Sequence, residues 1–177
     1  MKTCSLYGFI SALASAILGL VLFFAGYHSD PAKLSVAQSI GTWLGLLIFV
    51  VCLVLAIKTR RAETPLSEPF GYGSALWAGT LMTFVSALLS AIFNFFYLKF
   101  INPGFAEIVM QVQDEKLQAK GISGPALERA ENITRMMLNP PVASVFNLFF
   151  LFIIGFLIAL VVAAFITRPE PAAAPAA

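Results

Sequence analysis

Four long, uninterrupted apolar runs constrain the fold of this chain more than any other feature of its sequence. They cover residues 6–26, 40–57, 74–100 and 142–166. No Asp or Glu lies within them, and Lys99, at the end of the third run, is their single basic residue. About 20 mainly apolar residues are enough for a helix to cross the roughly 30 Å hydrocarbon core of a bilayer. The pattern therefore predicts four transmembrane helices.

Composition excludes a water-soluble globule. Hydrophobic residues make up 59% of the 177 residues and charged residues 11%, and the mean hydropathy is +0.88. Soluble domains carry about 25% charged residues, and about half of their residues are apolar. The runs are also continuous, whereas strands of a membrane barrel are about ten residues long and alternate in polarity. We therefore expect an all-α, polytopic membrane protein in which residues 1–168 form one transmembrane domain.

The first run has an alternative interpretation as a secretory signal peptide. Its apolar core is longer than the usual 7–15 or so residues, and Phe23–Tyr27 offers no small-x-small cleavage site. A retained first helix is favoured.

Aromatic and basic residues predict how the helices sit in the membrane. Trp and Tyr collect at membrane–water boundaries, and Lys and Arg close to the ends of spans favour the cytoplasmic side. The Trp and Tyr residues fall into two groups, Tyr7, Tyr72 and Trp77 at one boundary and Tyr27, Trp43 and Tyr97 at the other. A basic cluster, residues 58–61, directly follows the second run. We expect both termini to be cytoplasmic.

The segment between the third and fourth runs, residues 102–139, is predicted to form an amphipathic helical hairpin. Asn102-Pro103 is a favourable helix opening, and Gly121 is a favourable helix end. A second helix is expected to open at Gly124-Pro125 and to stop before Pro140. Its expected apolar stripe consists of Ala126, Ala130, Ile133 and Met137.

Three arrangements of this hairpin are possible. Its polar residues comprise five acids and four bases, whereas helices that bind an anionic membrane surface are rich in Lys and Arg. Packing on the end of the helix bundle is therefore favoured first, docking of a partner protein second and binding to the lipid surface third. The Pro/Ala-rich tail, residues 169–177, is predicted to be extended and disordered.

Small and polar residues within the runs are candidates for helix packing. Helices in lipid meet through such residues because hydrophobic association contributes little there. The candidates are Ser86, Ser90 and Asn94 in the third run and Asn147 and Gly155 in the fourth. Asn94 and Asn147 are expected to lie at similar depth and to form a hydrogen bond. A polar conduit or ligand pocket between the third and fourth helices is the alternative.

Similar stripes of small residues occur in the first two runs, and helix packing is again the favoured interpretation. They are Ser11, Ser15 and Gly19 in the first run and Gly41 and Gly45 in the second.

Catalytic, cofactor and metal sites are not expected. No ionisable residue lies at mid-membrane depth, where ion or proton pathways need one. His28, beside Asp30-Pro31, is interpreted as a turn residue rather than a ligand, and Cys4 and Cys52 as free thiols. No Ser-His-Asp set or phosphate loop is present. A net charge of +2 does not suggest a nucleic-acid partner.

Several segments resemble a bacterial inner-membrane family defined only as a domain of unknown function, number forty-one ninety-nine. The resemblance covers nearly the whole chain except the tail. It rests on residues 6–8, 58–61, 70–75 and 97–103 and on the amphipathic loop that ends at Asn139-Pro140. It implies four spans and a bacterial membrane but no activity, so no functional residues are carried over. Family members often have a basic C-terminal end, whereas Arg168 is followed here by Pro and Ala.

These observations together predict an integral inner-membrane protein without enzymatic activity. The favoured role is a structural, assembly or accessory subunit that contacts the bilayer and other membrane subunits or itself. The alternative is a small oligomeric transporter or channel for a neutral solute, because four spans alone seldom enclose a pathway.

Overall fold

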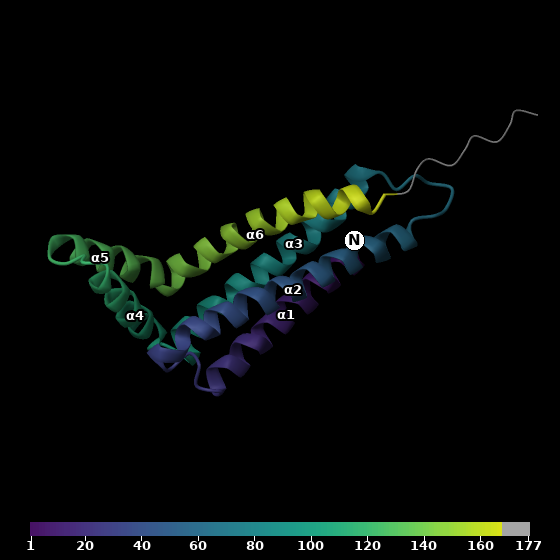
Figure 1. Cartoon of the computed structure of the whole chain (residues 1–177). Helices are drawn as coiled ribbons and strands as arrows, with labels where there is room; N and C mark the ends of the chain where they lie inside the picture. Colours follow the sequence, from purple (N-terminus) through teal and green to yellow (C-terminus); the bar gives the residue numbers. More distant parts are fainter. Residues whose placement is uncertain (168–177) are drawn as a thin grey trace, which may run out of the picture.

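The structure, a computed structural model, describes residues 1–167, and these residues are almost entirely helical (Figure 1). The elements are α1 (Lys2–Phe24), α2 (Pro31–Glu63), α3 (Tyr72–Phe96), the π-helical turn η1 (Tyr97–Ile101), α4 (Phe105–Ala119), α5 (Pro125–Leu138) and α6 (Pro140–Phe165). The all-α prediction is confirmed. Four of the helical segments are long and apolar enough to cross a membrane: α1, α2, α3 continued by η1, and α6. The predicted tail lies outside the described residues.

Helix α2 is longer than its apolar run predicts. It begins at Pro31 rather than near residue 40, because Asp30 caps it: the carboxylate accepts a hydrogen bond from the backbone N–H of Ala32 at 2.9 Å. Pro31 at the first helical position has its φ preset for a helix and lacks the N–H that would be unpaired there. The same cap-and-proline pattern that predicted an opening at residue 102 was present at residue 30.

Two glycines end helices by adopting positive φ. Gly121 (φ +78°) follows α4, where Ile122 N–H donates to the carbonyl of Leu117 and Gly121 N–H to that of Gln118. Gly26 (φ +79°) follows α1 with the same bonding pattern. This arrangement satisfies carbonyls that the last helical turn leaves open, and it favours glycine because a Cβ is strained at such φ. The prediction that Gly121 ends the first hairpin helix is confirmed.

Helix α3 lies at the centre of the bundle. It packs most extensively against α6 and α1, and α2 packs on α1 and α3. In Figure 1 the N-terminus and the last described turn of α6 lie at one end of the bundle, and the α4–α5 hairpin lies at the other. We call these the terminal end and the hairpin end. Helices α2 and α6 approach each other toward the terminal end, and the space between them widens toward the hairpin end.

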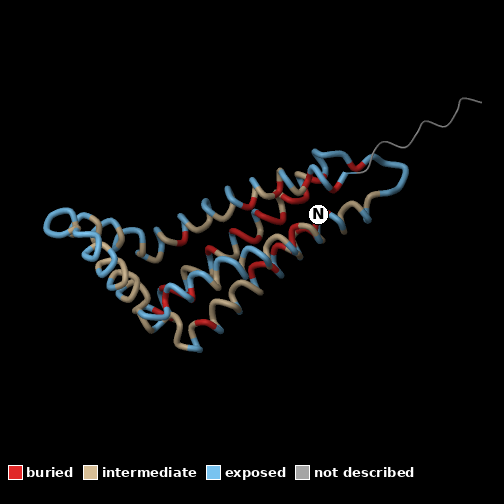
Figure 2. The backbone as a smooth tube through the Cα atoms, viewed as in Figure 1, coloured by how far each residue is buried: buried red, intermediate tan, exposed pale blue. Residues whose placement is uncertain are grey.

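The buried core lies mostly in the terminal half. The residues from α2, α3 and α6 that carry it, each at most 3% exposed, are Leu53, Ala56, Ile57, Ala75, Ala78, Met82, Ala159 and Ala163. Figure 2 shows the buried positions concentrated where the long helices face one another. The outer faces instead expose large apolar side chains, such as Trp43 at 71% and Phe165 at 82%. An apolar exterior around a core of small residues is what a lipid solvent permits.

The hairpin is only loosely attached to the bundle. The hairpin contacts the bundle in two places, between α4 and α2 and between α5 and α6. Neither α4 nor α5, both described in full, contains a buried residue, and Figure 2 draws the hairpin without red segments. It therefore reaches the bundle only at its base and projects away from it.

Two predictions about the hairpin are wrong. Asn102 does not cap the first hairpin helix: Gly104 takes that position, because the Asn102 side chain donates to the Tyr97 hydroxyl and the His28 carbonyl. In α5, the partly buried face consists of Leu127, Ala130, Glu131, Thr134 and Leu138. Ile133 and Met137 of the predicted stripe are 55% and 42% exposed. Along most of its length α5 packs against α4, with a smaller contact to α6, and these neighbours cover only one narrow face.

Candidate functional site: a groove among the long helices

A cavity of about 510 Å³ lies in the hairpin half of the bundle, between the four long helices. We call it the interhelix groove. Residues from every long helix line it: Ala12, Ser15 and Ala16 of α1; Gly41, Thr42, Gly45, Leu46 and Phe49 of α2; Ser86, Ser90, Phe93 and Asn94 of α3; and Asn147, Phe150, Leu151, Ile154, Gly155 and Ile158 of α6. Ligand pockets typically have about 300–1,000 Å³. The groove is thus large enough for a small molecule or a lipid chain.

The groove is closed toward the terminal end by a tight contact of three helices. A Cβ added to Gly155 would lie 2.5 Å from Cγ2 of Thr83 and 2.7 Å from Cζ of Phe49. A larger residue at this position would force the side chains of Thr83 and Phe49 to move. The predicted role of Gly155 in helix packing therefore has a specific geometric basis here.

The groove is open on the side where α2 and α6 separate. Three of its lining residues are exposed there: Leu46 at 37%, Phe150 at 53% and Ile154 at 40%. Both helices have apolar outer faces, so this opening would lead sideways into lipid rather than into water.

The two asparagines do not bond to each other. Asn94 Nδ2 donates instead to Ser144 Oγ at 3.5 Å, and Ser144 donates to the carbonyl of Pro140 at 2.7 Å. Asn147 lies almost one helical turn beyond Ser144 and lines the groove, and its buried Oδ1 has no hydrogen-bond partner within residues 1–167. The prediction of a direct Asn94–Asn147 bond is wrong because Ser144, which the sequence argument did not consider, occupies the position that faces Asn94.

The other predicted packing residues divide between contact and cavity. Ser86 is buried and donates to Ser11 of α1 at 3.3 Å. Ser90 lines the groove. Gly41 and Gly45 also line it, and no described atom lies within 4 Å of a Cβ built on either of them. The expected packing of these two glycines against another helix is therefore wrong: they widen the groove.

A second close approach was missed by the sequence argument. A Cβ on Gly8 would lie 2.7 Å from the backbone carbonyl oxygen of Met82 and 2.9 Å from Cβ of Val85. Gly8 precedes Ala12 by one turn on the same face as Ser11 and Ser15, so a longer small-residue stripe could have revealed it.

A shallower groove continues the cavity toward the hairpin end. It has a volume of about 310 Å³ and shares Ser15, Gly41, Thr42 and Gly45 with the interhelix groove. Its other lining residues are Leu18, Gly19, Leu22, His28, Ala37 and Gln38. Together the two grooves run from the α1–α2 loop into the middle of the bundle.

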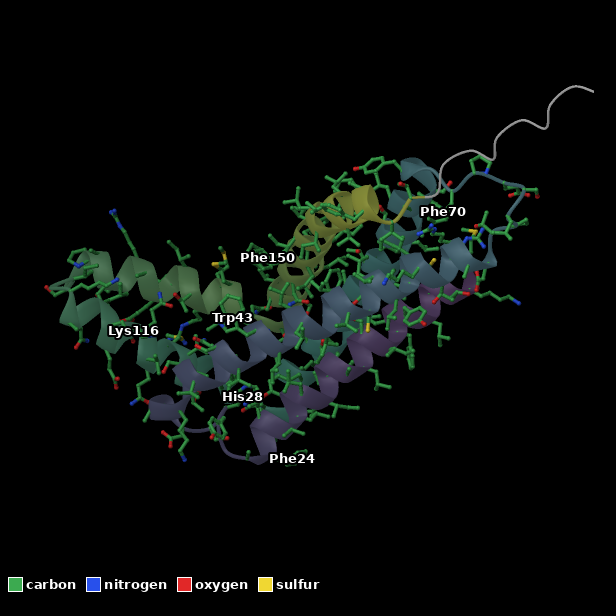
Figure 3. All side chains as sticks on the ribbon, turned by 45° about the vertical axis from the view of Figure 1, so that its right-hand side comes forward. Phe24, His28, Trp43, Phe70, Lys116 and Phe150 are labelled. Carbon is green, nitrogen blue, oxygen red and sulfur yellow. The ribbon has the colours of Figure 1, made fainter. Side chains whose placement is uncertain are left out.

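His28 closes the outer end of this path as part of a polar and aromatic cluster. Its Nδ1 and the Tyr97 hydroxyl form a 2.5 Å hydrogen bond, and its ring meets Phe105 edge-on at 5.5 Å between centroids. Asn102 binds both the Tyr97 hydroxyl and the His28 carbonyl. Figure 3 shows His28 and Phe24 at the hairpin end and Phe70 at the terminal end. The cluster ties the α1–α2 loop to η1 and to the first turn of α4.

Burial lowers the pKa of His28 below its ordinary value, because removing water disfavours the charged imidazolium. His28 lies in the loop after α1, as the turn interpretation expects. Burial, rather than the contact with Tyr97, is what favours the neutral imidazole.

Within residues 1–167, no group of three or more His, Cys, Asp and Glu side chains is arranged to hold a metal ion. Cys4 and Cys52 are both buried as free thiols.

The model of one protein family, described as "protein of unknown function (DUF4199)", matches residues 6–168. The chain belongs to this family. Neither the curated proteins nor the solved structures yielded a match. Segments that suggested the resemblance meet in the fold of this DUF4199 protein: the Tyr7 hydroxyl lies 3.3 Å from Thr59 Oγ1, and Phe70 is 2% exposed in the core. These segments hold helix ends together. The family match itself assigns no activity.

Proposed function

We propose that this protein is a non-enzymatic subunit of the bacterial inner membrane that recruits a partner protein through its α4–α5 hairpin. The four long apolar helices support a place in the membrane. The basic cluster after the α2 run, Lys58, Arg60 and Arg61, supports a cytoplasmic terminal end and an opposite hairpin end.

The observation that carries this proposal is an uncovered apolar face on a projecting helix. Ile133, Met136 and Met137 of α5 are 55%, 61% and 42% exposed and lie at i, i+3 and i+4 spacing. Met is common at surfaces that accept varied partners, because its side chain is flexible and polarizable. The bundle offers nothing to cover this face, since α4 packs on the opposite one.

The charged residues of the hairpin indicate which kind of partner surface would be complementary to it. A groove of about 500 Å³ on α4 is lined by Glu107, Asp114 and Glu115, with Arg135 of α5 beside them. A partner with an apolar patch and basic residues around it matches this arrangement.

The test is site-specific photocrosslinking in cells, with the photoreactive residue placed at Met136 of the full chain. We expect one discrete adduct whose protein component is identified by mass spectrometry and copurifies in mild detergent. The matched control places the same residue at Glu128, which is exposed on the same helix but points away from the side that carries Ile133 and Met137. Equal diffuse labelling at both positions, or labelling of lipid only at Met136, would contradict the proposal.

The interhelix groove supports a second candidate, an oligomeric transporter for a neutral solute. The groove has the volume of a ligand site, and its polar side chains are uncharged. A homo-oligomer that carries a neutral solute into liposomes would favour this candidate over the accessory role.

A further inference from the structure

We propose that the interhelix groove and its outer extension bind an uncharged membrane amphiphile, with the hydrocarbon chain in the deep part and a hydroxyl or amide N–H donating to Asn147 Oδ1. The inference rests on the membrane placement proposed above but does not depend on the hairpin or on a protein partner.

The length of the path matches one leaflet. Along α2 the path runs from Ala37 in the shallower groove to Phe49 at the closed end of the interhelix groove. Twelve residues of helix at 1.5 Å each correspond to about 18 Å. Half of a hydrocarbon core is about 15 Å. A lipid whose headgroup lies at the hairpin-side boundary would therefore have the end of its chain near the contact between Gly155, Thr83 and Phe49.

The polarity of the path changes along this length. The outer half carries the larger polar side chains, His28, Gln38, Asn94 and Asn147. Farther in, the polar groups are the hydroxyls of Ser86 and Ser90 among apolar residues such as Leu151 and Ile154. This gradient from polar to apolar is the one an amphiphile presents, with its headgroup and linkage outside and its chain inside. A rigid, uniformly apolar solute would leave the polar groups of the outer half without hydrogen-bond partners.

Asn147 specifies what the polar part of the ligand must supply. Its Oδ1 is buried and accepts no hydrogen bond from any described residue. An unpaired buried acceptor destabilises the protein, so a donor at this position is favoured. A hydroxyl or an amide N–H meets the requirement, whereas an ester oxygen does not.

The absence of formal charge along the path favours an uncharged ligand. Among the residues that line the two grooves, none is Lys, Arg, Asp or Glu. His28 is neutral at pH 7 because its burial disfavours the imidazolium. A carboxylate or phosphate at the level of Asn94 and Asn147 would have no counter-charge there.

The groove can be filled without disturbing the helix contacts. No atom of a neighbouring helix lies within 4 Å of a Cβ on Gly45, and Gly45 lines both grooves, so the ring of Gly45→Phe would occupy groove volume. The matched control is Gly73→Phe, because Gly73 is equally unobstructed but lies in the first turn of α3 at the terminal end. Thermal unfolding followed by circular dichroism in detergent checks that both variants fold.

The experiment measures binding to the purified full chain by native mass spectrometry. The probe is monoolein, and methyl oleate is its comparison, since it has the same chain length without a hydroxyl donor. We expect monoolein to bind the wild type and Gly73→Phe, and to bind Gly45→Phe at least tenfold more weakly. Asn147→Leu should bind monoolein about five- to tenfold more weakly than the wild type does, which is the effect of one lost hydrogen bond. Its affinity for monoolein should then equal its affinity for methyl oleate.

Three outcomes would overturn the proposal. The first is equal monoolein binding by the wild type and Gly45→Phe. The second is equal binding of monoolein and methyl oleate by the wild type. The third is a wild-type dimer that Gly45→Phe converts to a monomer without monoolein binding to either, since the groove would then receive a helix of a second copy. The crosslink at Met136 reads out the proposed accessory role separately, because Gly45→Phe leaves the hairpin unchanged.

Discussion

At the scale of single residues, the glycines of this protein have opposite uses. A Cβ on Gly155 would meet the side chains of Thr83 and Phe49, and one on Gly8 would meet the backbone of Met82, whereas Gly41 and Gly45 face open space in the groove. The same residue type in the same small-residue spacing therefore serves contact in α6 and α1 and volume in α2. Sequence spacing alone does not separate these uses, because it identifies a helix face but not the neighbour of that face.

The Gly155→Ala and Gly41→Ala substitutions should have opposite effects on stability. The first forces Thr83 and Phe49 to move, and such overpacking costs about 1–3 kcal/mol. The second meets no neighbour and replaces a glycine within a helix, which should stabilise the protein by up to about 1 kcal/mol. Unfolding of both variants in the same detergent by increasing SDS measures the difference. A loss of stability in Gly41→Ala as large as in Gly155→Ala would contradict the open groove.

His28 should titrate below its ordinary pKa of about 6.5, because burial disfavours its charged form. Unfolding exposes His28 to water and lets it bind a proton more readily. The stability that its burial as a neutral ring contributes is therefore fully present above about pH 6.5 and is lost as the pH falls through the lowered pKa. His28 is the single histidine of the chain, so one imidazole signal in an NMR titration reports it. Phe105→Ala should move the pKa upward by admitting water. A pKa at or above 6.5 in the wild type would contradict this burial.

The hydrogen-bond partners of Asn94 and Asn147 could not be predicted from the sequence. Spacing correctly placed Asn94 and Asn147 near the hairpin ends of their helices. It could not fix the rotation of α6 about its axis, which turns Ser144 toward Asn94 and Asn147 into the groove. A rotation of less than one helical turn thus converts a predicted contact into a candidate ligand site.

At the scale of elements, apolar length predicted α1, α3 and α6 closely, because in lipid a helix must satisfy all of its own backbone groups. It predicted the start of α2 poorly, since the first turns of α2 are polar enough to resemble a loop. The cap at Asp30 decides that boundary. The buried face of α5 was also mispredicted in part, because α4 and the start of the bundle cover only a narrow side of it and leave other apolar residues exposed.

Removing the cap of α2 should loosen the hairpin end of the bundle. Asp30→Ala deletes the acceptor for the Ala32 N–H and the 3.2 Å ion pair with Lys33, so the thermal midpoint in detergent should fall. Asp30→Asn retains a capping oxygen and should lose less. Hydrogen exchange at residues 32–34 measures the local effect. Equal exchange rates in the wild type and Asp30→Ala would show that the cap does not hold this turn.

At the scale of the whole molecule, a single crossing, that of α3 continued by η1, separates Arg61 from Asn139 in the proposed four-span arrangement. Reporter fusions after Arg61 and at Asn139 should therefore report opposite compartments, with Arg61 cytoplasmic because of the basic cluster that contains it. Both fusions reporting the same compartment would overturn the four-span arrangement. The reverse orientation of both would change only the assignment of sides.

The bundle is also broader at the hairpin end than at the terminal end (Figure 1). In a bilayer, a body of this shape displaces more lipid from one leaflet than from the other. Neighbouring lipids would then have to splay or crowd to follow its tapered outline, and the energy of doing so depends on local membrane curvature. Such a molecule would favour places where the leaflet facing the hairpin is stretched, which is the leaflet on the convex side of a curved membrane.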